Sequence, residues 1–191
     1  NDLATTDPAL MCEWDTEKNK GIMPESISRN SLRSVWWKCA YGHQWKARIR
    51  DRAIDGLGCS VCEKEFHELV PQLLIILYAG RQGMKPIINS DAEIGIPLEA
   101  YIPELGLAIE SSGATRAGAV KDYICSKRHI KLIRIPHNKD MKETAYAREI
   151  KKAFQKAHIY ISSDEDDDLA VIHKNFSDWR SKIKESVAEP R

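Results

Sequence analysis

Two short groups of metal-ligating side chains stand in the N-terminal third of the chain. Cys39 and His43 are separated by three residues, and Cys59 and Cys62 form a later C-x2-C pair. Three thiolates and one imidazole are the donor set of a closed tetrahedral zinc site, and a C-x2-C step lets two thiolates reach one ion from a single tight turn. The spacing therefore predicts a structural zinc ion held by these four side chains. A catalytic zinc is disfavoured because no coordination position is left open.

The other cysteines and the overall composition restrict the class of protein. Five cysteines are an odd number, which argues against a secreted disulfide framework and favours a reducing compartment. No apolar run approaches the ~20 residues that a membrane span needs, so we expect a cytoplasmic protein without a membrane partner. A hydrophobic content of 42% in 191 residues suits one ordinary domain or two small ones and excludes wholesale disorder. We predict that Cys12 and His67 are not metal ligands.

A run of positive charge overlaps the predicted zinc site. Between Arg29 and Arg52 the sequence has seven basic residues and a single acid, Asp51, although the whole chain carries a net charge of only +1. A local basic patch is typical of proteins that bind the phosphate backbone of nucleic acids. Charge alone is equally compatible with a solvated basic face. The residues expected to contact DNA are Arg33, Lys38, Lys46, Arg48, Arg50 and Arg52.

A helical pattern of apolar residues begins at Glu65. Apolar side chains recur with helical spacing along one stripe, which consists of Phe66, Leu69, Val70, Leu73, Leu74 and Leu77. Pro71 would interrupt helical hydrogen bonding, so a helix start near Val70 or a kink is an alternative. Gly80 and Gly83 are expected to end this helix.

Two β-rich segments carry one glutamate each. Residues 97–102 and 107–111 are predicted strands, and the tetrapeptide 103–106 between them favours a hairpin in which Glu99 lies opposite Glu110. Two like charges with Cβ atoms ~5 Å apart on one face of a sheet are destabilising. A divalent cation between them would reverse that sign. The alternatives are two solvated edge glutamates, or a bulge that separates the pair.

The remaining pattern predicts a mixed α/β domain. A helix over 117–128 is expected to connect the second strand to a third one over 130–135, followed by a helix over 141–156 and a short strand over 158–161. The acidic run 164–168 lacks the glycine and terminal Glu of a calcium loop and is interpreted as the start of a last helix. The predicted domains are a zinc module, residues 1–64, and an α/β domain, residues 65–191.

The zinc ligands stand within a longer pattern of residues. This pattern consists of Leu3-Ala4, Asp7-Pro8, Glu13-Trp14-Asp15, Lys18-Asn19, Val35-Trp36-Trp37-Lys38-Cys39, His43, Trp45 and Gly58-Cys59-x2-Cys62. It covers residues 3–62 and resembles the bacterial zinc-ribbon (treble-clef) repeat, which is often found beside restriction-type nuclease domains. The resemblance implies a DNA-binding module. Its four tryptophans are expected in the core, and stacking on bases is the alternative.

The second segment has a pattern of its own. It consists of Glu68, Leu98-Glu99-Ala100-Tyr101-Ile102-Pro103-Glu104-Leu105, Leu107-Ala108-Ile109-Glu110, Gly113, Lys121-Asp122 and Ile130-Lys131-Leu132-Ile133-Arg134-Ile135. Over residues 63–136 it resembles PD-(D/E)XK nuclease domains and is similar to the very-short-patch-repair endonucleases. The resemblance implies a restriction-endonuclease-like core of helix, mixed sheet, helix and strand. In that family, acids on the first two strands hold Mg2+, helped by an acid on the first helix, and these roles map to Glu99, Glu110 and Glu68.

The chain departs from this family pattern in three ways: Glu99 stands where Asp is usual, the histidine that often follows the glycine is absent, and position 112 differs. Two residues after Glu110, where relatives have Lys or Asp, stands Ser112. Lys121 on the following helix is a candidate for the missing cation, and Arg116 is a second one. The resemblance implies a catalytic set of Glu99, Glu110, Lys121 and Glu68.

The expected function is a metal-dependent DNA endonuclease that uses Mg2+ or Mn2+ and docks DNA through its zinc module. The resemblance implies a bacterial, nucleoid-associated protein whose partners are DNA and other proteins of a restriction, repair or mobile-element system. The alternative is a nuclease fold without catalysis that binds DNA or a protein partner. An RNA-binding zinc protein is disfavoured, because the sequence has no RNA-recognition motif of aromatic strands.

Overall fold

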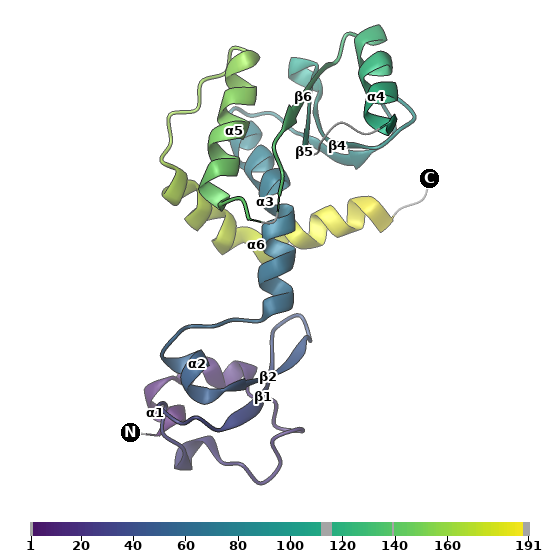
Figure 1. Ribbon diagram of the computed structural model, residues 1–191. Helices are drawn as coiled ribbons and strands as arrows, with labels where there is room; N and C mark the ends of the chain where they lie inside the picture. The colour runs from purple at the N-terminus through teal and green to yellow at the C-terminus, as the bar shows by residue number, and fades with distance from the viewer. Residues whose placement is uncertain (1, 112–115, 139, 189–191) are drawn as a thin grey trace. The chain divides into compact units, whose positions relative to one another are not determined.

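The chain folds into two compact units, residues 1–65 and 66–191 (Figure 1). The computed structural model describes residues 2–111, 116–138 and 140–188. Each unit contains its own sheet. The predicted domains divide the chain one residue earlier, at 64 and 65. Within the described ranges, no helix is both long and apolar enough to cross a membrane.

The first unit is built around a two-stranded antiparallel sheet. Strand β1 (Ser34–Lys38) pairs with β2 (Gln44–Arg48), and the pairs run from Ser34 opposite Arg48 to Lys38 opposite Gln44. Three short helical segments precede this hairpin and one follows it, namely α1 (Leu3–Thr6), η1 (Pro8–Glu13), η2 (Pro24–Ser26) and α2 (Ile49–Ala53).

Alternation along β1 supplies the core of the first unit. Val35 and Trp37 point to one face and are buried with Leu3, Trp14 and Ile49. The rings of Trp14 and Trp37 meet edge to face with centroids 5.6 Å apart, which is a favourable geometry for two aromatic quadrupoles. Such a small core is typical of a domain that needs a metal ion in addition.

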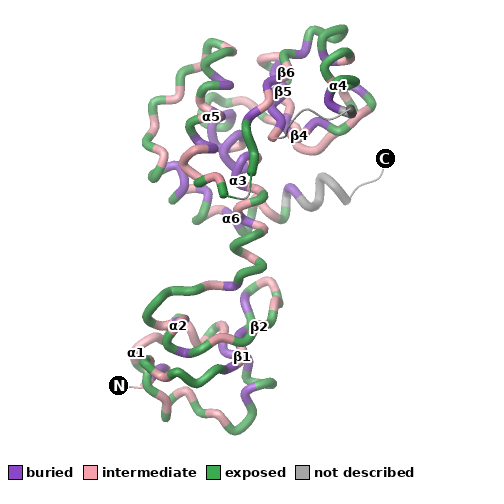
Figure 2. Tube along the Cα trace, in the orientation of Figure 1, coloured by how far each residue is buried: buried purple, intermediate pink, exposed green. Residues whose placement is uncertain are grey.

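The long helix α3 (Ser60–Arg81) starts earlier than the sequence pattern predicts. Its first turn contains Cys62, so the predicted start at Glu65 is wrong. Pro71 lies inside the helix and is buried, so the alternative start near Val70 is also wrong. The predicted apolar stripe is buried along its length, except at Leu69, which is half-buried. Figure 2 shows that the buried positions of α3 concentrate in its part within the second unit.

The second unit contains a mixed four-stranded sheet in the order β3-β4-β5-β6. Its strands are β3 (Ile87–Ser90), β4 (Leu98–Ile102), β5 (Leu107–Ser111) and β6 (Lys131–Ile135). The first three strands form an antiparallel meander, and β6 pairs parallel with β5 after the crossover helix α4 (Arg116–Lys127). Helices α5 (Glu143–Lys156) and α6 (Glu165–Ala188) complete the unit.

Helices cover both faces of this sheet, and α4 and α5 lie on opposite sides of it (Figure 1). On the α4 side, Ala108 of β5 packs with Leu98, Cys125 and Ile130. Ile109, which alternates with Ala108, is equally buried, so β5 has no face in solvent at its centre. Glu110 shares the face of Ala108, which directs it toward α4.

Two differences between prediction and structure have physical causes. The predicted strand over 158–161 is not a strand, since the chain there has no neighbouring strand to pair with. Strand β3 was not predicted, because its four residues are too few to show apolar alternation. One of them, Asn89, also has a positive φ of 50°, which is unusual for a strand residue. The hairpin turn is a short 3-10 segment, η3 (Pro103–Leu105), which Gly106 closes with a φ of 55°.

Candidate functional site

Cys39, His43, Cys59 and Cys62 converge in the first unit. Their ligand atoms all lie within 4.8 Å of one another. The Nδ1 atom of His43 is 3.3 Å from Sγ of Cys62 and 3.7 Å from Sγ of Cys59, and the Sγ atoms of Cys39 and Cys62 are 3.6 Å apart. Bonds of about 2.3 Å to sulfur and 2.0–2.1 Å to nitrogen give a zinc tetrahedron edges of about 3.5–3.8 Å. The donor set and its spacing therefore fit zinc.

The backbone holds the first pair of ligands in the β1–β2 turn. Cys39 and His43 directly follow β1 and precede β2, and the Cys39 N–H donates to the His43 carbonyl at 3.0 Å. Gly42 adopts a φ of 83°, a conformation that is strained for any residue with a Cβ atom. This turn brings two donors to the same side of the hairpin.

The second pair of ligands lies at the start of α3. The Cys59 carbonyl accepts the first helical hydrogen bond, from the Glu63 N–H at 2.9 Å, so Cys59 caps the helix and Cys62 lies in its first turn. The Glu63 carboxylate turns back and accepts a hydrogen bond from the Gly58 N–H at 3.0 Å. A hairpin turn and a helix start that share one ion are the layout of a treble clef.

Thiol electrostatics show why this cluster favours a cation. Burial raises the pKa of Cys62 to about 12, and the neighbouring Cys39 and Cys59 add to the rise. Burial also opposes ionisation of Cys39, but hydrogen bonds from the backbone of Tyr41 and His43 outweigh it and lower the pKa of that thiol. Adjacent thiolates repel one another unless a metal ion neutralises them.

The predicted non-ligands lie outside the cluster. Cys12 is exposed, and the group of four metal-ligating side chains includes neither it nor His67. Among the residues that the structure describes, this is the only group of three or more His, Cys, Asp or Glu side chains placed to hold a metal ion. Glu68 is exposed on α3 and does not form such a group with Glu99 and Glu110.

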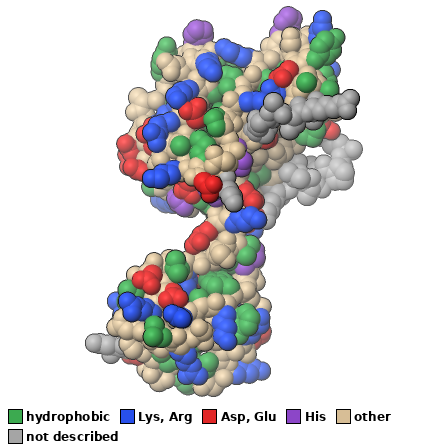
Figure 3. Space-filling model, viewed as in Figure 1, with side chains coloured by type: hydrophobic (Ala, Val, Ile, Leu, Met, Phe, Trp, Pro, Cys, Tyr) green, Lys and Arg blue, Asp and Glu red, His purple; other side chains and the backbone are tan. Residues whose placement is uncertain are grey.

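Five of the six predicted DNA-contacting residues are exposed, namely Arg33, Lys38, Lys46, Arg48 and Arg50. Lys and Arg side chains are spread over the visible face of the first unit (Figure 3). Arg52 differs because it is only 7% exposed. Its guanidinium donates to the Glu13 carboxylate and the Leu57 carbonyl and lies 5.2 Å from the ring centroids of Trp37 and Trp45. Arg52 therefore stabilises the module and is not available to a phosphate.

The two strand glutamates lie on neighbouring strands of the second unit. The β4–β5 pairs Ile102–Leu107 and Ala100–Ile109 follow the register that the sequence predicts, and Glu99 and Glu110 are the residues that come next on each strand beyond the last of these pairs. Glu110 is only 3% exposed. The Ser111 N–H and hydroxyl both donate to one Glu99 oxygen, at 2.7 and 2.6 Å.

Lys121 of α4 supplies the counter-charge for this acidic pair. Its Nζ atom lies 2.5 Å from Oε1 of Glu110. Arg134 of β6 lies beside Glu110 in the parallel register, and its guanidinium donates to the Asp122 carboxylate at 2.6 Å and the Gly118 carbonyl at 3.0 Å. Carboxylate oxygens on neighbouring strands are the donor type that Mg2+ and Mn2+ prefer. Ser112 and the side chain of Arg116 lie outside the described residues.

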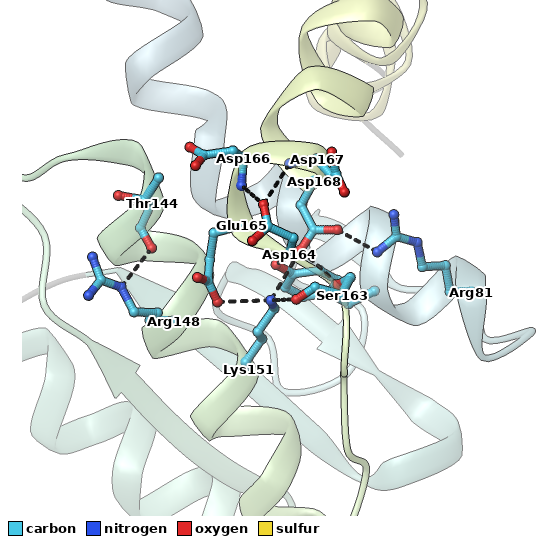
Figure 4. A network of polar contacts seen from close by, with 11 residues as sticks. Arg81, Thr144, Arg148, Lys151, Ser163, Asp164, Glu165, Asp166, Asp167 and Asp168 are labelled. Carbon is cyan, nitrogen blue, oxygen red and sulfur yellow. Dashed lines mark hydrogen bonds and ion pairs between the residues drawn. The ribbon is translucent and has the colours of Figure 1, made fainter.

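Sequence reasoning missed a second polar centre, around Asp168. This residue is fully buried in the first turn of α6 and accepts hydrogen bonds from Tyr78, Arg81 and Ser163 (Figure 4). Lys151 adds an ion pair at 3.3 Å. Tyr78, Arg81, Ser163 and Lys151 all belong to the same unit as this carboxylate, so the network is a structural one. The only signal in the sequence was an aspartate next to an apolar run.

Comparison with known families identifies the first unit only. Residues 10–65 match the family model described as a probable treble clef zinc finger domain. This match and the Cys/His cluster agree on a zinc-binding module. No curated protein matches the chain.

Proposed function

We propose that the protein is a metal-dependent DNA endonuclease, in which the zinc module docks DNA and the second unit hydrolyses a phosphodiester bond. One observation carries the catalytic part. Lys121 reaches buried Glu110 from α4, and Glu99 of the neighbouring strand accepts hydrogen bonds from Ser111, the residue next to Glu110. A nuclease centre of the PD-(D/E)XK type needs two acids and a cation, and the cation normally placed two residues after the second acid is missing here. Lys121 replaces it from the adjacent helix.

The topology of the second unit supports the same proposal. A helix, an antiparallel meander, a crossover helix and a parallel strand follow one another, as the resemblance to these nucleases implies. Glu110 lies near the end of β5, immediately before the connection to α4. Glu110 near the end of β5 and Glu99 near the start of the antiparallel β4 thus lie toward the same end of the sheet, where Lys121 pairs with Glu110.

The residues of this site would have different chemical roles. Glu99 and Glu110 would hold Mg2+ or Mn2+, which when bound lowers the pKa of a water molecule and stabilises the charge of the transition state. Ser111 fixes the orientation of Glu99 through two hydrogen bonds. The Lys121 ammonium has three donors, so it can donate to Glu110 and also to a phosphate oxygen or the attacking water.

DNA docking is assigned to the five exposed basic residues of the zinc module, Arg33, Lys38, Lys46, Arg48 and Arg50. Phosphate contacts of this kind position a nucleic acid and carry no base sequence information. Binding should therefore weaken steeply as the salt concentration rises.

Cleavage of supercoiled plasmid with Mg2+ or Mn2+ tests the catalytic proposal. We expect the native protein to nick or linearise the plasmid, and Glu110→Gln to lose at least about 100-fold in rate, because it removes a metal ligand without changing size. Glu104→Gln is the matched control, since Glu104 is exposed in the turn before β5, and it should cut like the native protein. Equal cutting by Glu110→Gln and native protein would contradict the assigned site.

A second candidate function is a nuclease fold that binds DNA without cutting it. The observation in its favour is that each strand glutamate already has a partner, Ser111 for Glu99 and Lys121 for Glu110. This alternative predicts salt-dependent DNA binding by the native protein and no cleavage with any divalent cation. The same plasmid assay, together with a binding titration, separates the two candidates.

A further inference from the structure

The hairpin of the zinc module has an outward face of unusual composition. Side chains alternate along a strand, so Ser34, Trp36 and Lys38 of β1 share one face with Gln44, Lys46 and Arg48 of β2. The five polar members are exposed and Trp36 is half-buried, while the residues between them face the core. This outer face carries three cations, no acid, and one large aromatic ring.

Trp36 differs in position from the other tryptophans of the module. Trp14 and Trp37 are buried in the core, and Trp45 packs against the same core. Trp36 stands on the opposite face, where burial of apolar area does not explain a residue of this size. Lys46 is its direct partner across the hairpin, and Lys18 places its ammonium 4.0 Å from the centroid of the ring system.

Hydrogen bonds hold the backbone of Trp36 at both its N–H and its carbonyl group. The Asn19 side chain accepts a hydrogen bond from the Trp36 N–H at 2.9 Å and donates to the Trp36 carbonyl at 2.7 Å. Asn19 itself is only 3% exposed. The indole therefore projects from a fixed point, so little conformational entropy is lost when a flat ligand stacks on it.

The cations around this ring are free to meet an anionic ligand. Within the described part of the chain, Lys38, Lys46 and Arg48 form no ion pair. Gln44 is held in place by its bond to the Asp15 carboxylate, at 2.8 Å. A rigid aromatic ring bordered by unpaired cations is the arrangement that binds a base on its face and phosphates at its edges.

We infer that this face binds single-stranded DNA, with an unpaired base stacked on Trp36 and the flanking phosphates held by Lys38, Lys46 and Arg48. The inference rests on the proposed function, that the zinc module docks DNA, and adds the strand state of its ligand. An indole stacks only on an exposed base face, which a duplex presents at ends, gaps and flipped nucleotides. Lys18 makes an exposed cation–π contact, which is weaker than base stacking, so the base displaces it and its ammonium moves to a phosphate.

Fluorescence anisotropy of the full chain without added divalent cation tests this inference. The probes are a labelled oligothymidylate of about 12 nucleotides and a labelled duplex of the same length. We expect Trp36→Ala to weaken single-strand binding about tenfold and Trp36→Phe to retain part of it, because phenylalanine still stacks. Lys46→Gln should lower the salt slope by about one phosphate contact. Tyr160→Ala, which removes a 72% exposed aromatic ring from the second unit, is the matched control and should bind like native protein.

Each outcome decides one of the two claims. Single-strand binding by Trp36→Ala at native strength, with an unchanged zinc content, overturns the stacking site. Native binding that favours the duplex also overturns it, but leaves DNA docking by the zinc module intact. Native protein that binds neither probe contradicts the docking function itself. If Trp36→Ala loses zinc or its native spectrum, Trp36→Phe decides the question in a folded protein. The oligonucleotide should quench the tryptophan emission of the native protein more than that of Trp36→Phe, and equal quenching of the two overturns the stacking site.

Discussion

The two units differ in how the charge of their main polar centres is balanced. The first unit collects three thiols and an imidazole whose ligand atoms lie within 4.8 Å of one another, and this group contains no Lys or Arg side chain. The second unit pairs each buried acid with a protein cation, Lys121 for Glu110, and Arg81 and Lys151 for Asp168. The first centre is therefore incomplete without an ion, whereas the second unit is electrostatically complete by itself.

This difference assigns different roles to metal ions in the two units. A zinc ion in the first unit is part of the fold, because metal binding and folding share one free energy in such small modules. A divalent cation at Glu99 and Glu110 would instead compete with Lys121 for a carboxylate that already has a partner. An ion there would therefore not be required for folding. Zinc removal and substitutions in the second unit test this difference in the role of metal ions.

Removal of zinc should unfold the first unit and leave the second one folded. Structural zinc contributes about 10–16 kcal/mol in comparable modules, far more than the core around Trp37 can replace. Cys59→Ser, or chelation of the native protein, should abolish the near-ultraviolet signal of the buried tryptophans. Amide exchange should show protection lost in residues 1–65 and retained in 66–191.

Cys12→Ser is the control for zinc removal. Cys12 is exposed and lies outside the cluster, so this variant should keep one zinc per chain and native stability. A zinc content that falls in Cys12→Ser but not in Cys59→Ser would reverse the ligand assignment.

Asp168→Asn should destabilise the second unit by about 3 kcal/mol. The substitution leaves buried cationic and hydroxyl donors without their common acceptor, and breaking a buried ion pair is among the costliest single changes. Urea unfolding monitored in the second unit measures it. Asp167→Asn changes the exposed neighbour on the same turn and should stay within about 0.5 kcal/mol. Equal effects of the two substitutions would show that Asp168 stabilises the second unit only through its interaction with the dipole of α6.

The contribution of Asp168 should also depend on pH. Burial opposes its ionisation, but hydrogen bonds from Tyr78, Arg81 and Ser163 outweigh it and lower its pKa. A folded pKa below the unfolded value of about 3.9 means that the stabilisation is complete above that value and is lost as the pH falls through the folded pKa. The stability difference between native protein and Asp168→Asn should shrink between about pH 5 and pH 2. A constant difference would contradict the pKa shift.

Features set by short-range spacing could be predicted from the sequence. The zinc ligands belong to two pairs, each confined to a single turn, so C-x3-H and C-x2-C suffice to place them. The β4–β5 register at Ile102–Leu107 and Ala100–Ile109 follows from a tetrapeptide turn, because pairing in a hairpin is fixed by its loop length. Both predictions needed only residues that are near one another in the chain.

Features set by distant contacts could not be predicted. Arg52 is a basic residue in a basic segment, as a DNA contact would be. Its partner Glu13, however, lies far from it in the sequence of the module. In the sequence, Asp168 does not differ from the other acids of its acidic run. Its partners Tyr78 and Arg81 lie on α3, far away in the chain. Burial of a charged residue depends on such long-range partners, which neither composition nor periodicity reports.

The Lys121–Glu110 pair should be worth about 2 kcal/mol in a double-mutant cycle. Glu110→Gln and Lys121→Met are the two single changes, and the coupling is large because Glu110 is only 3% exposed and Lys121 only 17%. Thermal unfolding of the four proteins measures the coupling. A coupling near zero would mean that the second unit is not electrostatically complete, and Mg2+ should then raise the melting temperature of the native protein markedly.

Arg134→Lys should have the smallest effect, about 1 kcal/mol. The arginine fork ties α4 to β6 through Asp122 and Gly118, and lysine keeps the charge but cannot make both hydrogen bonds. A looser α4 should hold Lys121 less firmly over Glu110, so the coupling energy of that pair should fall as well. Arg128→Lys, in the exposed turn directly after α4, should change neither quantity. If Arg134→Lys lowers stability but leaves the coupling intact, then Lys121 is held by Glu110 alone, and the counter-charge is a property of that pair and not of the α4–β6 frame.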